Sequence, residues 1–438
     1  MSLGSSINKY TIILCIGLLV SSQVSVAANH SNMDSVLTIE SAVRLSLENE
    51  PGISSQDWKV RSLAEKAISE SQLPDPKLKI GYLNLPTDTY DLDQENMTQF
   101  KIGITQSFPA GDVLDIKQKK IEKQSLAMRE KQEQRKLMII RNVRLTYLEI
   151  YYLEQSRKTI NENKKLFSQL TNIVRSLFTL GKNNQQDLIR TQLELTQLDD
   201  RIVKIDQKIN GLRYKLARWI GVESSKLPLY EKLPLWNSVE KYDSNSQQKD
   251  FVDQLINHPI IKESDQKIEI NRQDMAIIIE SYKPDWGVDV SYSYREDRPD
   301  GIERADLISI GASIDLPIFS AKRQDKKLLS EKYNFQSLKD ERVELLRELI
   351  SSLQQEYSNK SQLEKRYELY QSLLLPQAKQ QAEAALLAYQ SKRADFSDVM
   401  RAYIDDLNAR LDNMRIRIDL LKAKSKILYY LPSLSAEV

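Results

Sequence analysis

The chain contains two copies of one long sequence unit. Each copy has the same landmarks in the same order: Pro74-Asp75, Ile102-Gly103 and Phe108-Pro109 in the first, and Pro284-Asp285, Ile310-Gly311 and Leu316-Pro317 in the second. The separation is nearly constant and close to half the mature length, which indicates a duplicated domain rather than a short solenoid repeat. Each copy is predicted to run helix, two strands, very long helix, turn, long helix. So few strands cannot close a sheet within one chain, and the open edges predict an oligomer.

The first residues have the features of a secretory signal peptide, residues 1–28. Lys9 supplies positive charge, the apolar segment 11–20 is too short to span a bilayer, and the small residues at 25–27 fit a cleavage site. Cys15, the only cysteine, follows a leucine where a lipoprotein signal would have a small residue, so cleavage near Ala27 is favoured over a lipid anchor. The mature chain would then have no thiol and no disulfide.

Composition narrows the remaining choices. The 63 Lys and Arg residues nearly balance the 61 Asp and Glu residues, which argues against a nucleic-acid-binding surface. Long stretches rich in Leu, Gln, Glu, Lys and Arg, with only 12 glycines in 438 residues, favour extended helices. After the leader there is no apolar run of roughly 18 residues, so no transmembrane helix is predicted.

Four short segments alternate between large apolar and small or polar residues, near 77–85, 98–108, 286–294 and 307–317. A period of two is typical of strands with two different faces, and about 9 to 11 residues is the length of a tilted outer-membrane strand. The even-numbered residues are expected to face lipid and the odd-numbered ones a water-filled lumen. The alternative is two soluble hairpins, each packed on a helix. The polar connectors 86–97 and 296–306 suit either outside loops of a barrel or ordinary surface loops.

The helices are predicted to form long antiparallel hairpins. Residues 114–179 contain no proline, and a helix of that length is on the order of 100 Å long. Apolar residues recur every three or four positions, which predicts left-handed coiled-coil packing. The chain reverses near 181–187 and again near 392–398. Four strands and two hairpins per chain cannot close a tube, whereas three chains would supply twelve strands.

The most specific stretch lies near the end of the second copy. Leu375-Pro376-Gln377-Ala378 is followed by Ala388-Tyr389 and by the segment from Ala394 to Val399. Over essentially the whole mature chain, the sequence resembles the TolC-like outer membrane factor (outer membrane efflux protein) family. The segment 106–111, Gln-Ser-Phe-Pro-Ala-Gly, is similar to the strand-to-helix joint of its heavy-metal (CzcC-like) branch.

The resemblance implies a homotrimer in the outer membrane of a Gram-negative bacterium, with a 12-stranded β-barrel in the lipid and a large periplasmic α-barrel. A periplasmic adaptor (membrane fusion) protein would link it to an inner-membrane pump. The hairpin tips would contact the adaptor: Thr179, Leu180, Gly181, Gln390, Ser391 and Lys392. The chain is accordingly divided into a signal peptide (1–28), a first repeat (29–221), an equatorial linker (222–250) and a second repeat (251–438).

Two features depart from the family pattern. Lys392 stands at the second helix turn where glycine is usual, and each turn is followed by an Asp and Arg three residues apart, Asp187 with Arg190 and Asp398 with Arg401. Residues with this spacing share one face of a helix. They are candidates for a gate that joins neighbouring hairpins. The alternative is a local surface ion pair worth about 0 to 1 kcal/mol.

Nothing in the sequence suggests catalysis, a cofactor or a metal-binding site. The two histidines, His30 and His258, are far apart, and no phosphate-binding loop or nucleophile elbow is present. The predicted function is therefore a passive export duct, for heavy-metal cations or, alternatively, for drugs or secreted protein. Two alternatives come from other classes of protein. A periplasmic adaptor would need a single hairpin between β-rich halves, which the duplication argues against. A structural coiled-coil protein of the envelope would not need four strands of matched length.

Overall fold

The computed structural model describes residues 36–48, 50–181, 184–241 and 248–437. The predicted signal peptide, with Cys15, and His30 lie outside these residues. In chain order the elements are α1 (Ile39–Glu48), α2 (Pro51–Glu70), β1 (Lys77–Leu83), β2 (Gln99–Phe108), α3 (Val113–Thr179), α4 (Gln185–Ile220), α5 (Val222–Lys226), η1 (Asn237–Lys241), α6 (Gln248–Leu255), α7 (Pro259–Glu280), β3 (Asp285–Tyr294), β4 (Leu307–Asp315), α8 (Gln324–Leu369), η2 (Tyr370–Leu374), α9 (Leu375–Gln390), α10 (Phe396–Tyr430) and η3 (Pro432–Glu437). The order repeats as predicted, while the division into domains stays a prediction.

The long helix differs between the two copies at one place. In the first copy, α3 is continuous over 67 residues. In the second, a π-helical turn, η2, separates α8 from α9, and Pro376 lies in the first turn of α9. Proline lacks an N–H group and clashes with the carbonyl four residues before it, so it normally breaks a helix. The wider π turn in front of Pro376 relieves that conflict, which explains a proline inside an otherwise helical stretch.

Coiled-coil packing is confirmed by burial. Val143, Tyr147 and Ile150 of α3 are fully buried in a central cluster that also contains residues of α8 and α10. A second cluster lies nearer the hairpin turns, where Phe167 and Val174 of α3 pack with Met400 of α10. The two hairpins therefore pack against each other as well as internally.

Both hairpin turns use the same backbone geometry. Gly181 has φ of 66° and Lys392 has φ of 59°, so each turn places one residue in the left-handed region. Glycine adopts this conformation without penalty, whereas another residue costs about 1–2 kcal/mol. Lys392 is therefore a strained substitute for the glycine of the first copy.

The linker between the copies packs on the middle of the first hairpin. Leu37 and Leu229 form a parallel bridge. The hydroxyl of Tyr147 donates to the carbonyl of Leu37 at 2.9 Å, and that of Tyr151 donates to Glu231 O at 2.7 Å. Arg415 of α10 pairs with Glu149 of α3 at 2.8 Å. Linker, first hairpin and second hairpin are thus tied together at this level.

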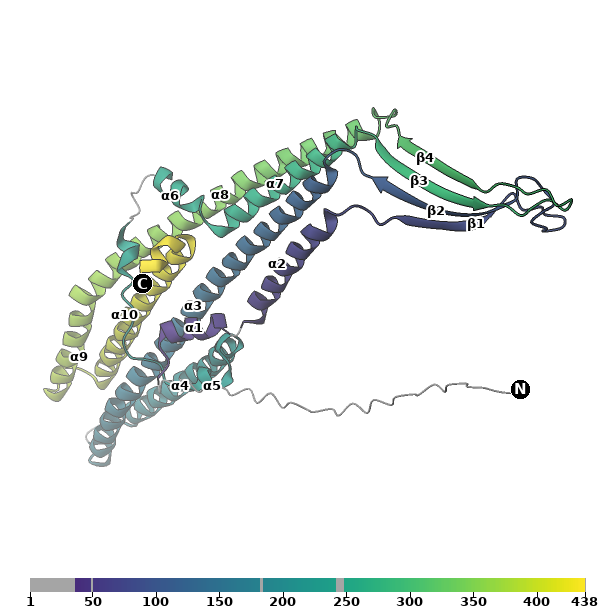
Figure 1. Cartoon of the computed structure of the whole chain (residues 1–438). Coiled ribbons are helices and arrows are strands. Elements are labelled where there is room, and N and C mark those ends of the chain that lie inside the picture. The colour runs from purple at the N-terminus through teal and green to yellow at the C-terminus, as the bar shows by residue number, and fades with distance from the viewer. Residues whose placement is uncertain (1–35, 49, 182–183, 242–247, 438) are drawn as a thin grey trace, which may run out of the picture. The chain divides into compact units, whose positions relative to one another are not determined.

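The four strands form one antiparallel sheet in the order β1-β2-β3-β4 (Figure 1). Two strands end earlier than predicted. β1 ends at Leu83, because Asn84 has a left-handed φ of 56°. β4 ends at Asp315, shortly before Pro317, which cannot donate a ladder hydrogen bond.

The register places every even-numbered strand residue on one face. Ile80 lies opposite Ile102, which lies opposite Tyr292, and Tyr292 lies opposite Ile308. This face is open, and Ile310 is 77% exposed. The odd face is crowded, since a Cβ on Gly103 would lie 2.8 Å from Ser291 Cβ. Small residues on this face leave room for a curved sheet, and the strands are bent in Figure 1.

His258 has a structural role at the start of α7. It is fully buried, its Nδ1 accepts from the Ile260 N–H at 3.3 Å, and its Nε2 lies 3.2 Å from the carbonyl oxygen of Tyr429. Burial lowers its pKa from 6.5 to about 4. The neutral ring thus caps α7 and ties it to the end of α10.

We expect this histidine to make the helical part acid-sensitive. The unfolded chain takes up a proton below about pH 6.5, whereas the folded chain does so only near pH 4. Stability should therefore fall as the pH drops through this window, by up to about 3 kcal/mol. Thermal unfolding followed by circular dichroism between pH 7 and 4 measures the effect. His258→Asn keeps a cap acceptor and should lose most of this pH dependence; an unchanged slope would contradict the assignment.

Candidate channel-forming surfaces

The open face of the sheet carries aromatic residues at both ends. At the connector end, Tyr82 lies beside Phe100, with ring centroids 5.2 Å apart, and Phe100 lies opposite Tyr294. At the helix end, Phe108 stacks on Trp286 with centroids 4.4 Å apart. Between these ends the side chains are mostly aliphatic, with Tyr292 and Gln106 as exceptions. The face is therefore an apolar band bounded by two aromatic rows.

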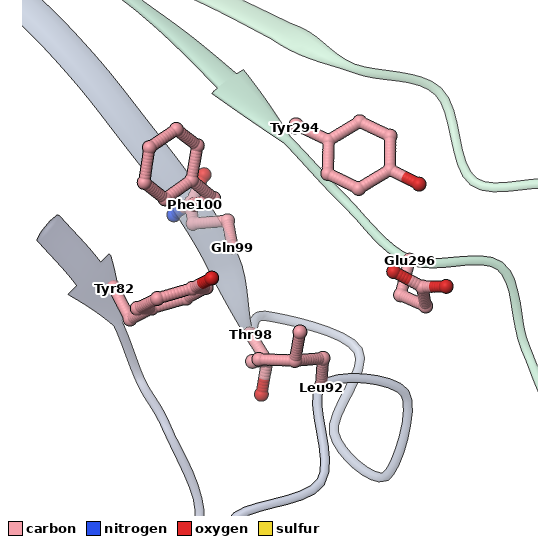
Figure 2. A pocket seen from close by; sticks show the side chains of 7 residues that line it. All are labelled: Tyr82, Leu92, Thr98, Gln99, Phe100, Tyr294 and Glu296. Atoms are coloured by element: carbon pink, nitrogen blue, oxygen red, sulfur yellow. The ribbon is translucent and has the colours of Figure 1, made fainter.

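Figure 2 shows the connector end of this band from close by. Tyr82, Phe100 and Tyr294 line a small hollow together with Leu92 and Thr98 of the first connector. The Thr98 hydroxyl donates to the Asn84 carbonyl at 2.8 Å, which fastens the connector at its base. Gln99 and Glu296 complete the lining, so the hollow combines the aromatic row with the polar side chains of Thr98, Gln99 and Glu296.

Arg304 joins the two connectors to each other. Its guanidinium donates to Asn96 Oδ1 at 2.9 Å and to the carbonyl of Asp93 at 3.2 Å. It also donates to the carbonyl of Glu296, in its own connector, at 3.1 Å. The acidic first connector and the second one thus form a single cap on this end of the sheet.

No group of three or more His, Cys, Asp or Glu side chains in the described part of the chain could hold a metal ion. None of the described helices is both long and apolar enough to cross a membrane.

The strand-to-helix joint of the first copy is closed by the second copy. The backbone N–H of Ala110 donates to Asp285 Oδ1 at 2.5 Å, and that of Asp112 donates to Glu280 Oε2 at 2.9 Å. Glu280 also pairs with Lys283 at 2.6 Å. Gly111, at φ of 51°, leaves no room for a side chain, because an added Cβ would overlap the Glu280 carboxylate. Two carboxylates thus fix the angle at which α3 leaves β2.

The predicted adaptor-contact residues all lie at the hairpin turns. They are exposed in the chain: Thr179, Leu180, Gly181, Gln390, Ser391 and Lys392. Leu180 is 67% exposed. The contact with an adaptor stays a prediction.

The gate candidates lie just after these turns, in the first turns of α4 and α10. Asp187 and Arg190 are half-buried, whereas Asp398 and Arg401 are exposed. Among the described residues, neither Asp–Arg pair is within the 4.0 Å of a salt bridge. Neither arginine is therefore paired with the aspartate of its own turn, and the gating role of these residues stays a prediction.

A fifth residue at this site was not predicted. Burial raises the pKa of Asp187, the carboxylate of Asp395 raises it further, and Arg190 opposes the change. Asp395 is the N-cap of α10, the position that Asn184 holds before α4. The two turns therefore bring like charges together. The sequence could have identified Asp395 as an N-cap from its match with Asn184. It could not have shown that the two turns lie close together.

Part of the chain matches a known family. Residues 42–222 fit the family model described as outer membrane efflux protein. No protein of curated function matches the sequence significantly.

Several solved outer-membrane proteins have a similar structure over nearly their whole length. CusC is 15% identical and has a TM-score of 0.74, with 90% of this chain and 91% of that chain covered. The chain has the fold of outer-membrane channels. VceC of Vibrio cholerae is 14% identical with a TM-score of 0.74 (90% and 95% covered), and CmeC of Campylobacter jejuni is 13% identical with a TM-score of 0.73 (90% and 85% covered).

We expect Asp187 and Asp395 to be coupled. Charging Asp187 is unfavourable in the folded chain, so lowering the pH through its raised pKa should remove repulsion and stabilise the tips. At pH 7, Asp187→Asn and Asp395→Asn should each stabilise the tip by a few tenths of a kcal/mol, since solvent screens the pair. The double variant should gain less than the sum. Hydrogen exchange of the tip amides measures this, and strict additivity would show that the carboxylates do not interact.

The gate itself is tested at the exposed pair. Asp398→Ala with Arg401→Ala should loosen a tip held by contacts between chains, and planar-bilayer conductance should rise above that of the parent. High salt should open the parent in the same way, because exposed pairs are screened over about 10 Å at 0.1 M. As a control, replacing the exposed neighbour Asp405 with Ala should change little. Unchanged conductance in a normally assembled double variant would leave the four residues as surface groups.

Proposed function

We propose that this protein is the outer-membrane duct of a tripartite efflux system, a passive homotrimeric channel in the outer membrane of a Gram-negative bacterium. The observation that carries this proposal is the open four-stranded sheet, apolar and exposed on one face and small and polar on the other. A water-soluble protein would cover such a face, whereas lipid covers it in a barrel. The family match over residues 42–222 supports the same conclusion.

The dimensions of the sheet suit a bilayer. The eight steps from Trp286 to Tyr294 cover about 27 Å along the strand at about 3.4 Å per residue. With a tilt of about 40°, the aromatic rows would be separated by about 20 Å in height, close to the roughly 25 Å band of outer-membrane barrels. In such a barrel the small polar residues would lie on the inside, where water would fill the lumen.

The rest of the chain would extend into the periplasm. The 67 residues of α3 span about 100 Å. We propose that the exposed hairpin turns meet a periplasmic adaptor protein, which joins the duct to an inner-membrane pump that supplies the energy. Transport would then be conduction through a tube and would require no catalytic residue.

The cargo is the least constrained part of the proposal. We propose heavy-metal cations, on the likeness of segment 106–111 to the joint of the CzcC-like branch. Drugs and secreted proteins are the alternatives within the same class. Expression in cells that lack their own duct, together with the cognate adaptor and pump, tests both the duct function and the cargo. Restored growth on metal salts supports cation export, restored growth on drugs redirects the cargo, and no rescue with a correctly localised protein would contradict the function.

Neighbouring residues of β4 test which face meets lipid. Ile310 lies opposite Val290, midway between the aromatic rows, so Ile310→Arg should cost about 2–4 kcal/mol of barrel stability. Ser309→Arg, on the same strand and the other face, should cost much less because a wet lumen solvates the charge. Heat-dependent gel mobility of the membrane fraction compares them. Equal damage at both positions would contradict the assignment of the faces.

A further inference from the structure

The joint that the second copy closes has an open counterpart in the same chain. By the sequence repeat, Pro317 corresponds to Pro109 and Ile318 to Ala110. Beyond these residues the joints differ in length, because α3 begins directly after Asp112 whereas α8 begins at Gln324. Ala110 is 3% exposed, whereas Ile318 is 71% and Phe319 is 79% exposed. The Ile318 N–H has no carboxylate partner among the described residues and donates back to the Leu316 carbonyl at 2.9 Å. The second joint therefore lacks the cover that the first one has.

The carboxylates that would close it are also present in the chain, at its other edge. Glu280-Ser281 and Pro284-Asp285 precede β3, and Glu70-Ser71 and Pro74-Asp75 precede β1 with the same spacing. Glu280 is buried in its contact with the first joint, but Glu70 is only half-buried and approaches Lys117 at 3.9 Å. Asp75 is exposed. One donor set and one acceptor set are thus left over, on opposite edges of one sheet.

We propose that these two edges close against each other between subunits, with Asp75 of the partner subunit accepting from the Ile318 N–H and Glu70 of the partner subunit lying beside the segment that leads into α8. The occupant of the open edge is a second copy of this chain. This inference rests on the proposed trimeric duct and specifies how its subunits join. The contact would repeat, between chains, the one that Asp285 makes with the Ala110 N–H within the chain.

The same reasoning fixes the strand register at the seam. Within the chain, Phe108 pairs with Trp286 and Ile104 with Val290. Carried over to the equivalent strands, the β2–β3 register places Ile314 opposite Leu78 of the partner subunit and Ser313 opposite Lys79 of the partner subunit. Large apolar residues then meet on the open face, and small or polar ones meet on the crowded face. The separation of apolar and polar residues therefore continues across the seam.

Charge supports this register. Asp315 lies opposite Asp285 within the chain, and like charges in directly opposed positions are destabilising. At the proposed seam the other side of Asp315 faces Lys77 of the partner subunit. A slip by one residue would remove this pair and would also turn the apolar side chains of one strand to the other face. The proposed register neutralises the charge that Asp315 carries at the free edge. A slip by two residues would place Asp315 opposite Lys79 instead, and the control pair of the cross-linking test below detects that slip.

Cysteine cross-linking tests the register directly, because Cys15 of the leader is the only cysteine in the sequence. Ser313→Cys with Lys79→Cys should give a covalent trimer on a non-reducing gel after mild oxidation, since directly opposed residues lie within disulfide range. The two positions are on opposite edges of the sheet, so a bond between them joins subunits. Ser313→Cys with Gly81→Cys is the matched control and should cross-link poorly, because diagonal Cα atoms are about 7–8 Å apart.

The outcomes separate this inference from the function it rests on. A trimer in which the control pair links better than the matched pair, or in which neither links, overturns the seam and leaves the duct standing. A monomeric protein overturns both. A charge exchange provides the second test. Asp315→Lys and Lys77→Asp should each speed trimer dissociation in detergent about tenfold, equivalent to about 1.4 kcal/mol. The double variant, which pairs the exchanged charges, should dissociate at the rate of the parent. Failure of the double variant to recover would contradict the pairing.

Discussion

The unpaired backbone of β1 and β4 is the constraint on which the rest of the structure depends. Each edge strand presents a row of N–H and C=O groups, and in lipid these groups have no water to bond. Such a sheet is therefore unstable in lipid, where its edges are unpaired, and in water, where its apolar face is exposed. In the proposed assembly, the edge of one copy pairs with that of the next, and the apolar face meets lipid. The small residues on the crowded face leave room for the curvature that closing the sheet requires.

The helices continue this geometry away from the sheet. Glu280 and Asp285 fix the joint between β2 and α3, so the direction of the first hairpin is set by residues of the second copy. Further along, the Glu149–Arg415 pair and the central apolar cluster hold the hairpins together. Near the turns, the packing of Phe167 with Met400 does the same. Duplication thus supplies not only two hairpins but also the contacts by which each copy positions the other.

Features with a short sequence period could be predicted, and features that depend on tertiary neighbours could not. The strands and the 67-residue helix follow from periods of two and about 3.5, which each segment carries in its own residues. The π turn before Pro376 could not be located, because a proline signals a conflict but not its solution. The proximity of Asp187 to Asp395 depends on how the hairpins pack. The carboxylates at the joint are visible in the sequence repeat. Their partners could not be predicted, because these are backbone N–H groups of the other copy.

The number of chains in the assembled channel is the most direct test of this interpretation, because the edges of a four-stranded sheet cannot be satisfied by one copy. Native mass measurement of the protein extracted from membranes in mild detergent gives that number. We predict three chains of the mature protein, with dissociation only under conditions that also unfold the sheet. A stable, folded monomer with an intact sheet would contradict the interpretation at its foundation.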